Sequence, residues 1–186
     1  MKHINIYTLF LLMAAATLTA CKKEEVKPQR MVVAKPEPPK PMGTQQLDSQ
    51  DRTEVHAWRG NEYTVSIKRS ADESMPVVDD GTGVKYYDNR ITVSVKRADG
   101  SSFYSRTFTK NDFSSFLSSA AMKSRVLYAI TLHEVSNEAL QFVACVGSPD
   151  ASSDDYQLLE IRLSADGSER IKETAILDRE VVDDEV

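Results

Sequence analysis

The sequence predicts an α+β domain made mostly of antiparallel β-sheet, with about seven or eight strands and one covering helix near residues 110–121. Several segments alternate apolar and polar residues with a period of two, which is typical of strands with one buried face and one exposed face. Asp-Gly turns separate two pairs of segments, and only one segment has apolar residues at helical spacing. The alternative is an all-β sandwich or barrel.

The first predicted strands cover residues 63–67 and 91–95, where every second residue is apolar. Residues 102–109 form a further β-rich run. The connection at residues 98–101 reads Ala-Asp-Gly-Ser, and Asp-Gly is a strong hairpin signal. The second and third runs are therefore predicted to be antiparallel neighbours.

The predicted helix follows these strands. Thr109 or Asn111 can cap its first turn, because each offers a side-chain oxygen to N–H groups that lack a helical partner. Its apolar face consists of Phe113, Phe116, Leu117 and either Ala120 or Ala121. We expect this face to pack on the sheet.

The remaining predicted strands lie in the second half of the domain. Residues 126–135 and 139–146 are more continuously apolar, which favours central positions in the sheet. Residues 158–163 and 170–177 flank a second Ala-Asp-Gly-Ser at residues 165–168. We interpret the repeated tetrapeptide as one turn chemistry used twice rather than as a duplicated hairpin.

The chain divides into a signal peptide at residues 1–20, a tether at residues 21–50, the β-rich domain at residues 51–178 and an acidic tail at residues 179–186. Five of the seven prolines lie between Pro28 and Pro41. Such a segment has too little apolar surface to offset the entropy of folding, and proline favours an extended chain. The tether is therefore expected to be a semi-rigid stalk.

Composition and charge exclude some partners. The chain has 186 residues and a net charge of −5, whereas proteins that neutralise phosphates need a basic surplus. We therefore expect no nucleic acid partner. With only two cysteines, Cys21 and Cys145, we expect no disulfide.

The N-terminus has the pattern of an export signal. Residues 4–18 are mostly apolar but too short for a membrane span, which needs about 20 residues. The sequence Leu18-Thr19-Ala20-Cys21 then resembles a bacterial lipobox. This resemblance implies cleavage between Ala20 and Cys21 and acylation of Cys21 with diacylglycerol and palmitate. The alternative is a plain secretory signal.

A second signal follows the lipobox. The run Lys23-Glu24-Glu25 resembles the surface-export signal of Bacteroidota lipoproteins. The resemblance implies a lipid-anchored protein on the outer surface of the outer membrane. The alternative location is the periplasmic face of the same membrane.

Groups that could carry chemistry do not form a known catalytic or metal motif. His133-Glu134 begins like a zinc-protease motif, but Asn137 occupies the position of the second histidine, and the segment is a predicted strand. The acidic segments at residues 79–83 and 150–155 lack calcium-loop spacing and are interpreted as turns. Cys145 is expected to pack in the core, and Trp58 to lie in the core or at its rim, with a ligand platform as the alternative for Trp58. We therefore predict no catalytic, cofactor or metal residues and no cofactor.

The whole layout resembles small Bacteroidota lipoproteins of uncharacterised function, and residues 106–113 are similar to one such domain family of unknown function. The resemblance names no activity. Our leading hypothesis is a cell-envelope lipoprotein whose non-catalytic β-rich domain binds an envelope protein, a glycan or another ligand. One alternative is an envelope hydrolase, for example one acting on glycans, with an unrecognised carboxylate site. The other is an accessory subunit of an outer-membrane complex.

Overall fold

The computed structural model describes residues 43–174, all of which belong to one compact unit. The predicted signal, Cys21, the tether up to residue 42 and the acidic tail lie outside the described residues. Within the described part of the chain, no helix is long and apolar enough to cross a membrane.

Strands dominate the described residues, which contain ten strands and two short helices. In chain order these are β1 (Gln50–Trp58), β2 (Asn61–Asp72), β3 (Val78–Asp79), β4 (Lys85–Tyr86), β5 (Asp88–Arg97), β6 (Ser102–Phe108), the 3₁₀-helix η1 (Lys110–Phe116), α2 (Ser119–Ser124), β7 (Val126–Val135), β8 (Ala139–Gly147), β9 (Tyr156–Ser164) and β10 (Glu169–Glu173). One four-stranded sheet has the order β1-β2-β5-β6, and the other has the order β10-β9-β8-β7. All neighbouring strands are antiparallel, and β3 and β4 form a separate pair.

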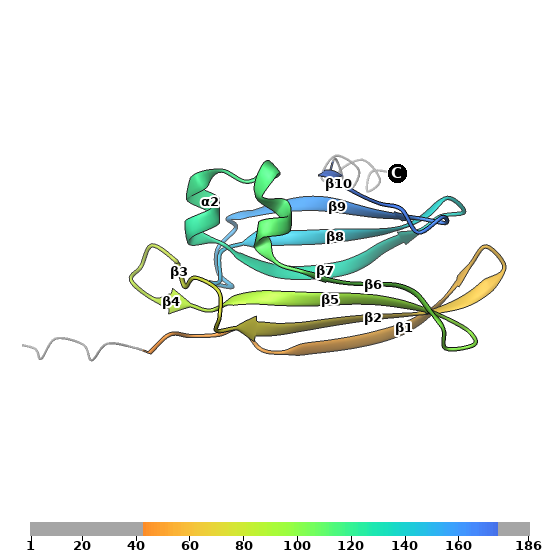
Figure 1. The fold of residues 1–186 in the computed structure, drawn as a ribbon. Coiled ribbons are helices and arrows are strands. Elements are labelled where there is room, and N and C mark those ends of the chain that lie inside the picture. Colours follow the sequence, from red (N-terminus) through yellow and green to blue (C-terminus); the bar gives the residue numbers. More distant parts are fainter. Residues whose placement is uncertain (1–42, 175–186) are drawn as a thin grey trace, which may run out of the picture. The chain divides into compact units, whose positions relative to one another are not determined.

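The two large sheets pack against each other and share one apolar core (Figure 1). Alternate residues of β5, such as Ile91, Val93 and Val95, point into this core, as do Leu140 and Phe142 of β8. The prediction of a mostly antiparallel β-rich fold is confirmed. The strands form two open sheets, so a single sheet under one helix describes the fold only approximately.

Both predicted Asp-Gly hairpins are present. Residues 98–101 connect β5 to β6, and residues 165–168 connect β9 to β10. In the first turn the N–H of Gly100 donates to the carbonyl of Arg97 at 2.9 Å, and Gly100 has a φ of 81°. Gly167 repeats this geometry with a φ of 83°. Glycine adopts such left-handed backbone without steric cost, which explains why the tetrapeptide occurs twice.

Strand β1 is not predicted by the sequence pattern. Most of its side chains are exposed, so the strand carries no apolar alternation, and only Trp58 at its end is buried. The two-residue turn to β2 consists of Arg59 and Gly60, both with positive φ. The prediction of Trp58 as a core residue is confirmed, because its side chain is 2% exposed and packs edge-on against Tyr63 and Phe103.

The single helix predicted at residues 110–121 is wrong, because the segment forms two short helices. η1 ends at Phe116, since Leu117 has extended backbone with φ −106° and ψ 139°. Ser118 then caps α2 by accepting a hydrogen bond from the N–H of Ala121. Of the two cap candidates, Thr109 is the one that flanks the first helix.

Part of the segment predicted as a tether contacts the β-rich domain. Gln45 pairs with Tyr86 in an isolated bridge, and its N–H donates to the carbonyl of Lys85 at 2.7 Å. The carbonyl of Asp48 accepts two hydrogen bonds from the guanidinium of Arg69, at 3.2 and 2.8 Å. The first strand starts at Gln50, one residue before the predicted start of the domain.

Candidate functional site

The strongest candidate site lies beneath an excursion of the chain between β2 and β5. Residues 73–87, which we call the flap, include the short strands β3 and β4. The flap lies beside α2 at one end of the two sheets (Figure 1), and β3 contacts α2 directly. A cavity of about 350 Å³, which we call the flap pocket, is lined by residues of the flap, of α2 and of the start of η1.

The walls of the flap pocket are largely apolar. They consist of Met75, Pro76, Val77, Val78 and Met122. Val78 is buried, whereas Val77 is 48% exposed and lies at the rim. Methionine side chains are flexible and adapt to different shapes, so two of them in one wall suit the binding of an apolar group.

The polar residues of the flap pocket are Asp79, Asp88, Lys110, Asn111 and Lys123. Asp88 and Lys110 form an ion pair with a separation of 3.0 Å, and both side chains are almost fully buried. Two lysines and two aspartates balance the charge of the lining. An apolar cavity with a few fixed polar groups has the general character of a ligand site.

Hydrogen bonds fix both members of this ion pair. One carboxylate oxygen of Asp88 accepts from the backbone N–H groups of Asn89 and Leu127, at 2.8 and 2.9 Å. The other oxygen faces the ammonium of Lys110, which also donates to the carbonyl of Arg125. The pair therefore ties the start of β5 to η1 and β7, and it forms a rigid polar floor.

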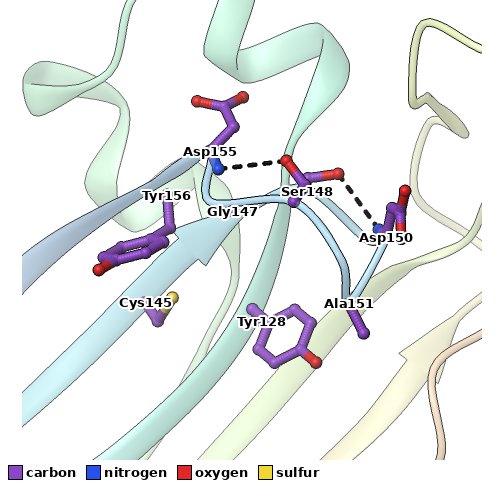
Figure 2. A pocket seen from close by; sticks show the side chains of 9 residues that line it. Tyr128, Cys145, Gly147, Ser148, Asp150, Ala151, Asp155 and Tyr156 are labelled. Carbon is purple, nitrogen blue, oxygen red and sulfur yellow. Dashed lines mark hydrogen bonds between the residues drawn. The ribbon is translucent and has the colours of Figure 1, made fainter.

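A second, smaller pocket of about 170 Å³ lies between strands β7–β9 and the loop at residues 148–155 (Figure 2). Cys145 forms part of its wall together with Tyr128 and Tyr156. Cys145 is half-buried here rather than part of the core, because strand alternation points its neighbours Ala144 and Val146 inward instead. The expectation that it packs in the core is therefore wrong.

Cys145 lacks the surroundings of a nucleophile. Burial raises the pKa of its thiol, although the charge of Arg125 acts in the opposite direction. Ala129 is its partner on β7, and His133 lies four residues further along, about 13 Å at 3.3 Å per residue. A thiolate nucleophile needs a lowered pKa and a nearby base, so this pocket does not support thiol catalysis.

Seven carboxyl groups of the described residues have a lowered pKa. Within residues 43–174, the pKa is lowered at Glu54, Asp72, Asp80, Asp99, Asp112, Asp150 and Asp166. At six of them, hydrogen bonds are the largest influence. At Asp112 burial is the largest influence, and it opposes the shift. A carboxylic general acid needs a raised pKa, so these groups fit structural roles.

The acidic segments are turns, as predicted. One carboxylate oxygen of Asp80 accepts hydrogen bonds from Thr82 and from the N–H of Val84. Asp150 binds Ser152 in the same way. His133 and Glu134 lie on β7, as predicted, and no group of three metal-ligating side chains occurs among the described residues.

Sequence reasoning missed the flap pocket. Asp88 and Lys110 are 22 positions apart and belong to no spacing motif. A charged residue at the start of a strand and a lysine after a helix cap also occur on ordinary surfaces. The contact arises only when η1 folds against the start of β5, so a local pattern cannot reveal it.

A family model described as a domain of unknown function (DUF4738) matches residues 30–171, which is more than half of the chain. The match begins inside the predicted tether and ends within β10. No curated protein matches this chain. The prediction of a domain of unknown function is confirmed.

Proposed function

The chain belongs to the DUF4738 family, whose function is unknown, and we propose that it is a lipid-anchored lipoprotein of the bacterial cell envelope. Its β-rich domain binds a ligand and catalyses no reaction. The anchor is Cys21, acylated after cleavage at Ala20, and residues 22–42 act as the stalk. The protein faces outward from the outer membrane.

Sequence features support the anchoring. The lipobox-like Leu18-Thr19-Ala20-Cys21 directly follows an apolar segment of export-signal length. Several acyl chains on one cysteine contribute about 0.8 kcal/mol per buried methylene, which is enough for stable attachment to a membrane. The proline-rich segment after the cysteine is suited to holding a domain away from the lipid surface.

The flap pocket carries the proposal of binding. Its volume of about 350 Å³ is in the range of small-ligand sites, its walls are mostly apolar, and its polar floor is fixed by hydrogen bonds. The Asp88 carboxylate at its floor is committed to structure, because it already accepts from two backbone N–H groups and from Lys110. Binding therefore fits this geometry better than catalysis.

Native mass spectrometry of the full chain purified from its own envelope tests the binding proposal. We expect the wild type to carry an additional mass that denaturation releases. Val77→Asp adds a carboxylate at the rim of the flap pocket, where desolvating it would oppose an apolar ligand, and should abolish the additional mass. Val55→Asp is the matched control, because Val55 is 63% exposed on β1 and does not line the pocket.

The binding proposal would be contradicted if the wild type carried no additional mass, or if Val77→Asp carried it to the same extent.

The outward location has a separate test. Protease added to intact cells should remove the domain, whereas alanine at Lys23, Glu24 and Glu25 should protect it. A domain that resists protease until the outer membrane is opened faces the periplasm.

A further inference from the structure

We infer that the flap pocket takes a neutral ligand with a carbonyl oxygen attached to an apolar group. This inference rests on the proposed binding function and specifies the class of ligand. It follows from three properties of the pocket: one hydrogen-bond donor without an acceptor, balanced charges and an apolar wall.

The donor belongs to Lys110. A lysine ammonium has three N–H groups. In the described part of the chain, the acceptors for Lys110 are a carboxylate oxygen of Asp88 and the carbonyl of Arg125. One N–H group therefore lacks an acceptor, although the side chain is only 6% exposed and lines the pocket. A buried donor without an acceptor is costly, so a ligand that brings an oxygen to this position is favoured.

The charges around this donor favour a neutral oxygen over an anion. The ammonium of Lys110 is already compensated by Asp88 at 3.0 Å. A carboxylate placed on Lys110 would therefore lie close to the buried Asp88 carboxylate, where like charges repel strongly. Asp79 in the same lining adds to this repulsion, and Lys123 offsets it. An amide, ester or ketone oxygen accepts the hydrogen bond without this repulsion.

The apolar wall defines the rest of the ligand. Met75, Val77 and Met122 line the same pocket as Lys110. The volume of about 350 Å³ is at the lower end of ligand sites and suits a group of side-chain size. Such a carbonyl can come from a free small molecule or from a peptide with an apolar side chain.

Methyl NMR of the full chain, with ¹³C-methyl methionine, tests the ligand class. The chain has six methionines, of which Met75 and Met122 line the pocket, and Met31 and Met42, which follow the proposed cleavage at Ala20, serve as internal controls. Methionine-to-leucine variants assign the two signals. The probes are isovaleramide, its anionic isostere isovalerate, and acetamide, which keeps the amide without the branched group.

We expect isovaleramide to shift the Met75 and Met122 signals at concentrations at least tenfold lower than isovalerate or acetamide. The response should disappear in Val77→Asp and persist in Val55→Asp. Asp88→Asn combined with Lys110→Met removes the donor together with its counter-charge, and should weaken isovaleramide binding about tenfold. N-acetyl-leucinamide distinguishes the sources, since tenfold tighter binding than isovaleramide identifies a peptide.

Equal or tighter binding of isovalerate would overturn the inferred class while leaving the binding function intact. The same holds if no probe shifts either methionine but native mass spectrometry finds a bound molecule. If neither experiment detects a ligand, the proposed binding function itself is wrong. Because Val77 is exposed, Val77→Asp remains informative even if the Asp88 and Lys110 variant does not fold.

Discussion

Asp88 and Lys110 show how much a single buried contact can matter to this fold. Removing one member leaves the other charged and desolvated, which costs about 3–5 kcal/mol in comparable pairs. We therefore predict that Asp88→Asn and Lys110→Met each lower the free energy of unfolding by several kcal/mol. The combined variant should lose less than the sum, because it leaves no unpaired charge. Urea unfolding monitored by circular dichroism measures these changes.

An exposed ion pair supplies the control. Lys68 and Asp51 are 2.8 Å apart, but their side chains are 62% and 59% exposed. Exposed pairs contribute about 0–1 kcal/mol. The importance of burial would be refuted if Lys68→Met destabilised the protein as much as Lys110→Met.

Asp112 should make the stability depend on pH. Burial by itself raises the pKa of Asp112, but hydrogen bonds from Thr109 and Arg106 outweigh it, so the pKa lies below its usual value. A carboxyl group with a lowered folded-state pKa stabilises the fold above its unfolded pKa of about 3.9, and this contribution is lost as the pH falls through the folded pKa.

We therefore predict that Asp112→Asn has a lower free energy of unfolding than the wild type at pH 7. The difference should decrease as the pH falls below about 4 and disappear below the folded-state pKa of Asp112. Urea unfolding at a series of pH values measures it. Asp51→Asn, which removes one carboxylate from exposed strand β1, controls for the change in net charge. A difference that is independent of pH would mean that Asp112 acts through packing rather than through its charge.

Among the elements, the two Asp-Gly hairpins make a paired prediction. Gly100 and Gly167 have φ values of 81° and 83°, and a Cβ at either would meet no atom within 4 Å. Alanine should therefore cost only the backbone penalty of about 1–2 kcal/mol at each position. Gly43→Ala is the control, because it also has open space but no positive φ. Urea unfolding measures these changes. The explanation would be contradicted if Gly43→Ala lowered the free energy of unfolding as much as the other two substitutions.

These elements also show what sequence patterns can and cannot reveal. The strands β2 and β5 to β10 and both Asp-Gly turns follow from alternation, apolar runs and turn chemistry, which act over a few residues. Strand β1 lies at the edge of its sheet and most of its side chains are exposed, so no apolar alternation predicts it. The break at Leu117 and the pairing of Asp88 with Lys110 depend on contacts with distant elements, which no local pattern encodes.

For the molecule as a whole, the structure places the boundary of the domain ahead of the first strand. Gln45 and Asp48 bind Tyr87 and Arg69, and the Arg69 side chain is almost fully buried. A chain that starts at residue 43 should keep its melting temperature within about 2 °C of the full chain. A chain that starts at Gln50 leaves Arg69 without the Asp48 carbonyl, which should cost about 1–3 kcal/mol and several degrees. Equal melting temperatures for both truncated chains, measured by calorimetry, would show that residues 43–49 contribute nothing.

The intact mass of the protein isolated from its own envelope shows whether a lipid attaches this domain to a membrane. We expect a chain that begins at Cys21 and carries the added mass of a diacylglycerol and a further acyl chain. Cys21→Ser should lose that added mass and leave the signal peptide uncleaved, or release the protein from the membrane. A wild-type chain that begins at another residue, or that begins at Cys21 without acyl groups, would contradict the account.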